Sequence, residues 1–479
     1  MTIKLGEKSD SINIRNETKP ILTKKTNIMQ DNESEIVLYS GRWIYLLLFV
    51  FASATNGFNW VELTIITDIV EEYYNVSTLA VTWTSMLYFV PYIPLIFPAT
   101  WYLQNKGLRS TIILGALGTC LGCWIKLFGT RKSGFPIVFA GQTLTAISEV
   151  FILGIPSELA ATWFPQNQIS LACAIGVFGN QMGVALGFLL PPIIVRRHED
   201  MLDSTLVGSD LFTLFLSLAV VTTIVLILIV TLFPDWALSS PRKSESYETL
   251  SPESSPKESS YFSGFCSSIQ SLLNNAGFRY LLIAYGIIVG IYYAISSLLT
   301  VTLLHHFENI DSDSGRIGLV IVVAGMFGSI IFGVILDKTH AYKRLTLILC
   351  SFSFLGMVFY SIAMYSSNLS LIYISAGVLG FFMTGYLPVG FEFGVEMTYP
   401  ESEGTSCGLL NASAKVFALI FTLGGEQLMA HFDDTLVHIM MGSALFICTI
   451  LTVSIRFTKV RQKVYTSYST PSSISTTSR

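Results

Sequence analysis

The chain has 479 residues, of which 52% are hydrophobic and only 13% are charged, and its formal net charge is −4. Soluble domains carry roughly 25% charged residues, so this composition excludes an ordinary soluble enzyme, and the weak net charge gives no reason to expect a nucleic-acid partner. A helix needs about 20 apolar residues to cross a bilayer, and stretches of that length recur through the chain. We therefore expect an all-α, multi-pass membrane protein whose surroundings are the lipid bilayer.

In chain order, a polar tail (1–42) comes first, and its lack of an apolar region argues against a cleaved signal peptide. Six predicted crossings follow, then a Ser/Pro/Glu-rich linker (235–276) that is too polar to fold alone, six more crossings, and a polar tail (458–479). The predicted halves are therefore 43–234 and 277–457. The twelve crossings are predicted at 43–67, 81–103, 108–128, 135–160, 168–193, 211–233, 278–304, 315–336, 344–365, 369–395, 405–430 and 437–457.

The distribution of lysine and arginine predicts the orientation. Of the 28 such residues, Lys126 and Lys415 are assigned to crossings; when residues at the ends of crossings are counted with the adjoining side, five lie on one side of the membrane and 21 on the other. The positive-inside rule then places both termini and the linker in the cytoplasm. Asn75 and Asn368 begin Asn-x-Ser sequons in loops on the opposite side, so we predict that both are glycosylated.

The two halves echo each other. Phe164-Pro165 follows the fourth crossing and Tyr399-Pro400 follows the tenth, 235 residues later. Two six-helix halves related by an axis along the membrane normal resemble the architecture of the major facilitator superfamily, in which the substrate site lies near the midplane between the halves.

Aromatic and polar residues at matching depths predict a binding site. Asn56, Trp60 and Thr64 are spaced so that one helical face of the first crossing can present them together, whereas Glu62 should face elsewhere. Tyr292 and Tyr293 lie at the corresponding depth of the seventh crossing, and the candidate site also includes Tyr88 from the second. Ring faces from both halves attract an ammonium group; the alternative is that Trp60 and Tyr293 only pack or belong to an interfacial belt.

Two opposite charges lie deep in apolar crossings. Glu149 is in the fourth and Lys415 is in the eleventh, and neither should be tolerated alone. If they meet across the central cavity they neutralise each other; the alternative is a purely structural pair, or a separate partner for each. Lys126, near the outer end of the third crossing, is expected to snorkel and is given no role.

Charged residues near the cytoplasmic ends predict gating contacts. Glu392 and Glu396 are one turn apart on the tenth crossing and are candidates for ion pairs with a base such as Arg109. The loop after the eighth crossing holds a second candidate group, which resembles the charged latch motif of the superfamily and comprises Asp337, Lys343 and Arg344. No nucleotide-binding or catalytic motif is legible, so we expect no enzyme activity, no cofactor and no metal site.

Longer strings then match one family. They are FNW at 58–60, YIPLIFPATW at 92–101, VFILG at 150–154, GNQ at 179–181, GFLLPP at 187–192, GFFMTGYLP at 380–388 and YPESEGTS at 399–406. Together they resemble the feline leukemia virus subgroup C receptor-related transporters over residues 42–457.

This resemblance implies a carrier for choline or ethanolamine, earlier described as a heme exporter. It implies the plasma membrane as the location, with an organelle membrane as the alternative. It implies that Trp60 and Tyr293 bind the cation. The choline-transporting members have glutamine at the positions of Glu149 and Lys415, so the two charges distinguish this chain.

The sequence therefore predicts a carrier, most simply a monomer, that moves choline, ethanolamine or a related small organic cation by alternating access. Alternatives are a carrier for heme or another larger organic solute, and a receptor or sensor that binds its ligand without net transport.

Overall fold

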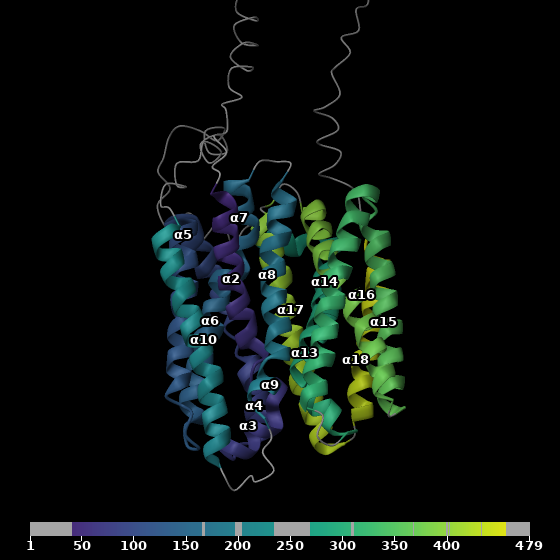
Figure 1. Ribbon diagram of the computed structural model, residues 1–479. Helices are drawn as coiled ribbons and strands as arrows, with labels where there is room; N and C mark the ends of the chain where they lie inside the picture. Colours follow the sequence, from purple (N-terminus) through teal and green to yellow (C-terminus); the bar gives the residue numbers. More distant parts are fainter. Residues whose placement is uncertain are drawn as a thin grey trace, which may run out of the picture.

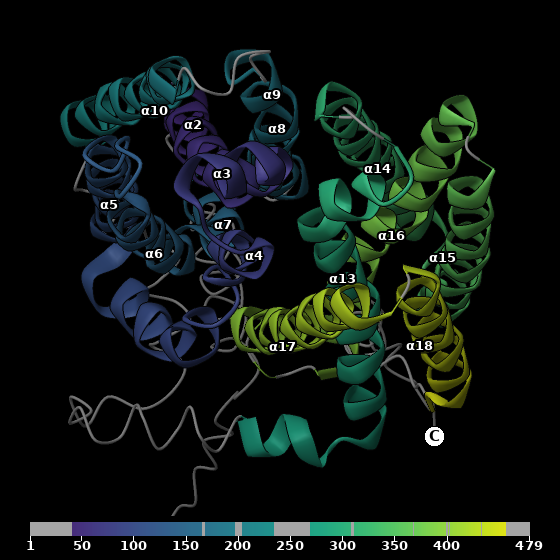
Figure 2. The same ribbon diagram turned by 90° about the horizontal axis from the view of Figure 1, so that it is seen from below.

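The computed structural model describes residues 41–164, 168–196, 204–233, 269–307, 311–366, 368–398, 401, 403–432 and 434–456. Every regular element in these ranges is helical, and the helices run roughly parallel in one bundle (Figure 1). Seen from one end, the helices from α2 to α10 form one group and those from α13 to α18 a second, with α17 beside the boundary (Figure 2). The predicted tails and most of the linker lie outside the described residues.

The helices of the first group are α2 (Arg42–Val61), η1 (Thr64–Ile66), α3 (Thr67–Tyr74), α4 (Thr78–Met86), α5 (Tyr92–Leu127), α6 (Phe135–Leu153), α7 (Ile155–Trp163), α8 (Ile169–Leu189), α9 (Pro191–Ile194) and α10 (Ser204–Leu232). Those of the second group are α13 (Ala276–Leu304), α14 (Asp311–Thr339), α15 (Tyr342–Tyr365), α16 (Leu369–Thr398), α17 (Glu403–His431) and α18 (Asp434–Ser454).

Eleven stretches among the described residues are long and apolar enough to cross a membrane. The remaining predicted crossing, 81–103, is built in two pieces, α4 and the first part of α5, because the chain turns at 87–91. Pro91 caps α5 and Pro98 lies inside it, and proline removes a backbone donor that a continuous helix would use. At Gly107, where φ is +81°, the chain bends into the predicted third crossing; only glycine adopts that backbone geometry easily.

Small residues let the helices approach closely. A Cβ on Gly183 of α8 would lie 1.9 Å from the carbonyl oxygen of Ala54 on α2, and one on Gly318 of α14 would lie 2.5 Å from the ring of Phe188 on α8. The second contact joins the two halves. Such small-residue interfaces are common between membrane helices, where van der Waals packing takes the place of the hydrophobic effect.

Candidate functional site

An aromatic cluster lies where the halves meet. Trp60 is in the last turn of α2, Phe89 is in the turn between α4 and α5, and Tyr293 is in the middle of α13. The centroid of the Trp60 ring is 5.2 Å from that of Tyr293 and 6.2 Å from that of Phe89, and the last two are 5.7 Å apart. Trp60 and Phe89 are buried and Tyr293 is half-buried. The site therefore presents rings from both halves at one level.

Glu149 and Lys415 join the halves at the same place. Lys415 Nζ of α17 lies 3.2 Å from Oε1 and 3.4 Å from Oε2 of Glu149 on α6. Both side chains are buried, with residue exposures of 2% for Lys415 and 7% for Glu149. The two charges thus form one buried pair across the interface, the meeting that the sequence left open.

The ammonium of Lys415 also lies within the aromatic cluster. Its Nζ is 4.6 Å from the ring centroid of Tyr293, 5.1 Å from that of Phe89 and 5.6 Å from that of Tyr92. These separations are within the range of a cation–π interaction. We call the rings of Trp60, Phe89, Tyr92 and Tyr293 the aromatic cage; it holds the protein's own cation.

Two other predicted site residues hold the first half together. Asn56 Nδ2 donates to the carbonyl oxygen of Thr145 at 3.0 Å and to Oγ1 of Thr119 at 3.2 Å, and the Tyr88 hydroxyl donates to Oγ1 of Thr145 at 2.9 Å. These bonds tie α2, α5, α6 and the turn before α5 together. Tyr292 is buried next to the cage, with its ring centroid 5.7 Å from that of Tyr293.

The expected face of the first crossing is wrong at Thr64. The helix α2 ends at Val61, and Thr64 begins the short helix η1, so Thr64 does not continue the row of Asn56 and Trp60. Its hydroxyl donates to the carbonyl oxygen of Val61 at 3.1 Å. The helical spacing on which the prediction depended holds only up to the break.

A buried network was missed. Lys126 of α5 is completely buried, so the expectation that it snorkels is wrong. Its Nζ donates to Glu62 Oε1 and Asn59 Oδ1, and to Gln142 Oε1 at 3.2 Å. Gln142 Nε2 in turn donates to the carbonyl oxygen of Asn59 at 2.6 Å. All four residues belong to the first half, and Asn59 and Glu62 flank Trp60. The sequence feature that could have predicted this network is the occurrence of an acid, Glu62, and a base, Lys126, near the outer ends of two predicted crossings.

Two of the predicted gating residues, Arg109 and Lys343, form hydrogen bonds within their own halves. Arg109 donates to the carbonyl oxygen of Val230 on α10 at 2.9 Å. Lys343 donates to the carbonyl oxygens of Val453 and Ile455 at 2.8 and 2.6 Å, which ties α15 to the end of α18. Among the other predicted members, Glu396 is buried and Asp337 and Arg344 are exposed. The gating role stays a prediction.

The halves also touch away from the cage. Thr82 of α4 donates to Glu426 Oε2 of α17 at 3.1 Å, and Thr300 of α13 donates to the carbonyl oxygen of Ile65 in η1 at 3.0 Å. These contacts join the halves towards the end of the bundle at which α3 and α4 lie (Figure 1).

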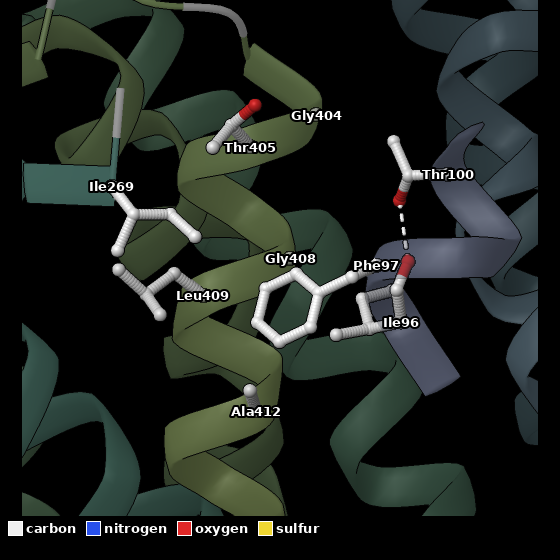
Figure 3. Close-up of a pocket in the computed structure, with 9 residues that line it drawn as sticks. All are labelled: Ile96, Phe97, Thr100, Ile269, Gly404, Thr405, Gly408, Leu409 and Ala412. Carbon is white, nitrogen blue, oxygen red and sulfur yellow. Dashed lines mark hydrogen bonds between the residues drawn. The ribbon is translucent and has the colours of Figure 1, made fainter. Parts of the chain in front are cut away.

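Towards the other end there is a hollow between α5 and α17 (Figure 3). Its lining comprises Ile96, Phe97, Thr100, Ile269, Gly404, Thr405, Gly408, Leu409 and Ala412. Ile96 is about one turn from Tyr92, and Ala412 is about one turn from Lys415. The hollow therefore adjoins the cage.

The sequence profile of the Major Facilitator Superfamily matches residues 45–422. The choline/ethanolamine transporter flvcr2a of Danio rerio is 43% identical over 438 residues, which is 91% of each chain. FLVCR2 of Homo sapiens, also named a choline/ethanolamine transporter, is 39% identical over 88% of this chain and 78% of that protein. The chain belongs to the FLVCR family of the major facilitator superfamily.

Solved structures agree on the fold of this family member. The fucose:proton symporter of E. coli aligns with a TM-score of 0.59 and 13% identity over 87% of this chain and all of that one. The xylose transporter XylE of E. coli, in a partially occluded inward-open conformation, gives 0.63 and 11% over 88% and 100%. The expected family and the all-α superfamily fold are confirmed, and the protein is a multi-pass membrane carrier.

Proposed function

We propose that this FLVCR-family carrier moves a small organic solute of the choline/ethanolamine class, which binds through its ammonium group in the aromatic cage. The observation that carries the proposal is the position of Lys415, whose ammonium already lies 4.6 Å from the Tyr293 ring centroid. A desolvated cation–π contact contributes up to about 2 kcal/mol. The names of the Danio rerio and human relatives support the same class of solute.

The cage suits alternating access because it is shared. Trp60, Phe89 and Glu149 come from the first half, whereas Tyr293 and Lys415 come from the second. Rotation of one half against the other would therefore assemble or open the site. With the outer contacts of Thr82 and Thr300 closed, we propose that the hollow between α5 and α17 is the path by which solute leaves the cage towards the cytoplasm.

The proposal also includes the oligomeric state, the location and the orientation of the protein. We propose that the protein acts as a monomeric carrier and not as an enzyme, in the plasma membrane, with both termini in the cytoplasm. The support for the orientation is the charge distribution of the loops. Heme is not proposed, because the two relatives compared above are named for choline and ethanolamine.

The test is uptake of labelled choline, ethanolamine and glycine betaine into cells that express the protein at a measured surface density. We expect saturable uptake of at least one of these ammonium-bearing solutes, and its loss in Trp60→Ala and Tyr293→Ala. The matched control is Trp101→Ala, because Trp101 is 41% exposed and lies outside the cage. Uptake that is equal in Trp60→Ala and the parent, or the absence of uptake of all three solutes, would refute the proposal. Binding without accumulation would instead indicate a receptor.

A further inference from the structure

We infer that the preferred solute is a zwitterion, in which an anionic group lies a few bonds from the ammonium, and not a simple cation. The inference rests on the proposed function, because it assumes that an ammonium group binds in the aromatic cage. It assigns to Lys415 the recognition of the anionic group.

The first argument is the charge balance of the cage. Glu149 and Lys415 form a neutral pair with 3.2 Å between Nζ and Oε1, and both are buried. A simple cation that enters adds one positive charge to this enclosed space, next to an ammonium that is already there. A zwitterion adds none. Because like charges repel strongly where water is excluded, the neutral solute is the one that the buried pair tolerates.

The second argument is the space that the lysine occupies. Its Nζ lies over the rings of Tyr293, Phe89 and Tyr92, so a solute ammonium must displace it to reach the same ring faces. When Lys415 moves away, its ion pair with Glu149 breaks, and Glu149 pairs with the ammonium of the solute instead. A carboxylate or phosphate on the solute then supplies the partner that Lys415 has lost, and the flexible lysine stem allows the movement. The exchange replaces one ion pair with two.

The third argument is a buried donor without an acceptor beside the cage. Among the described residues, Trp60 Nε1 is one of several buried side-chain polar atoms that have no hydrogen-bond partner. Trp60 packs against both Phe89 and Tyr293, the rings that also contact Lys415. An unpaired buried donor is unfavourable, and an anionic oxygen held by Lys415 is an acceptor of the kind that Trp60 lacks. Trp60 would thus help to bind the anionic end while its ring contributes to the cage.

The experiment compares choline with glycine betaine, because both carry a trimethylammonium group and only the second carries a carboxylate. Uptake is measured over a range of concentrations for the parent, for Lys415→Gln and for Glu149→Gln/Lys415→Gln. We expect KM for glycine betaine to be about tenfold or more below that for choline in the parent, as a hydrogen bond to a charged group implies. In the double variant, which keeps the cage neutral without charges, we expect the preference to reverse.

Two further variants distinguish an effect of the charge at Lys415 from a general loss of folded protein. Lys415→Arg keeps the positive charge and should keep the preference for glycine betaine, whereas Lys338→Gln removes an exposed positive charge and should leave both KM values unchanged. Equal KM values, or a parent that prefers choline, would overturn the inference and leave the proposed function intact. A preference for glycine betaine that persists in the double variant would also overturn it. Absence of uptake of both solutes would refute the inference, and with ethanolamine also inactive the proposed function fails too.

Discussion

Replacing Glu149 and Lys415 by glutamine, singly and together, tests whether the two buried charges depend on each other for stability. Lys415 Nζ lies 3.2 Å from Glu149 Oε1, and with an effective dielectric constant of about 20 the gross attraction is about 5 kcal/mol. Either single substitution leaves one buried charge without its partner, which costs about 3–5 kcal/mol. The double substitution leaves two neutral amides, so its cost should fall below the sum of the single costs by at least about 2 kcal/mol.

The assay is unfolding of the purified protein in mixed micelles by increasing proportions of SDS, with the surface density in cells as a second measurement. We expect both single variants to unfold at lower SDS and to reach the surface less well than the double variant. Lys338→Gln serves as the control for loss of one exposed positive charge and should match the parent. If the effects of Glu149→Gln and Lys415→Gln simply add, the charges do not interact, and the reasoning from the 3.2 Å separation is refuted.

Three more predictions follow from other parts of the molecule. Tyr293→Phe should keep most of the uptake that Tyr293→Ala loses, because the cage needs a ring face and not a hydroxyl; equal loss of uptake in both variants would contradict this. Asn75, which is exposed in the turn after α3, should give a glycosidase-sensitive band shift, whereas the sequon at Asn16 in the N-terminal tail should not; a shift that disappears in Asn16→Gln would reverse the orientation. Lys126→Met should reduce the free energy of unfolding by about 3–5 kcal/mol, because it leaves Glu62 buried without its counter-charge. If Lys126→Met unfolds at the same proportion of SDS as the parent, the pair does not stabilise the fold.

The crossings and the family were predictable from the sequence because they depend on composition along the chain. Apolar length predicts twelve crossings, and the described residues contain eleven long apolar helices. The remaining stretch, 81–103, is divided by the turn at 87–91. The meeting of Glu149 and Lys415 was open to prediction for a related reason. A charge deep in an apolar crossing must find a partner, and these two are of opposite sign.

The sequence did not predict which face each helix turns towards its neighbours. Lys126 was placed near a helix end, where a lysine often reaches water, and only the packing of α2 against α5 shows that Glu62 and Asn59 meet it there. The error at Thr64 has a different origin. A helical face can be extended only while the helix continues, and α2 ends at Val61.

Two buried lysine–glutamate pairs among the described residues differ in the helices that they join. This difference distinguishes a structural pair from one that transport must break. Glu62 and Lys126 both belong to the first half, so their pair persists when the halves rotate and its role is to hold α2 and α5 beside Trp60. Glu149 and Lys415 belong to different halves, so any rotation that separates α6 from α17 must break their pair. Breaking it in an empty cage would leave two uncompensated buried charges, which is strongly unfavourable. A solute that brings one group for each charge removes that cost, and the same pair that selects the solute then also opposes reorientation of the carrier without it.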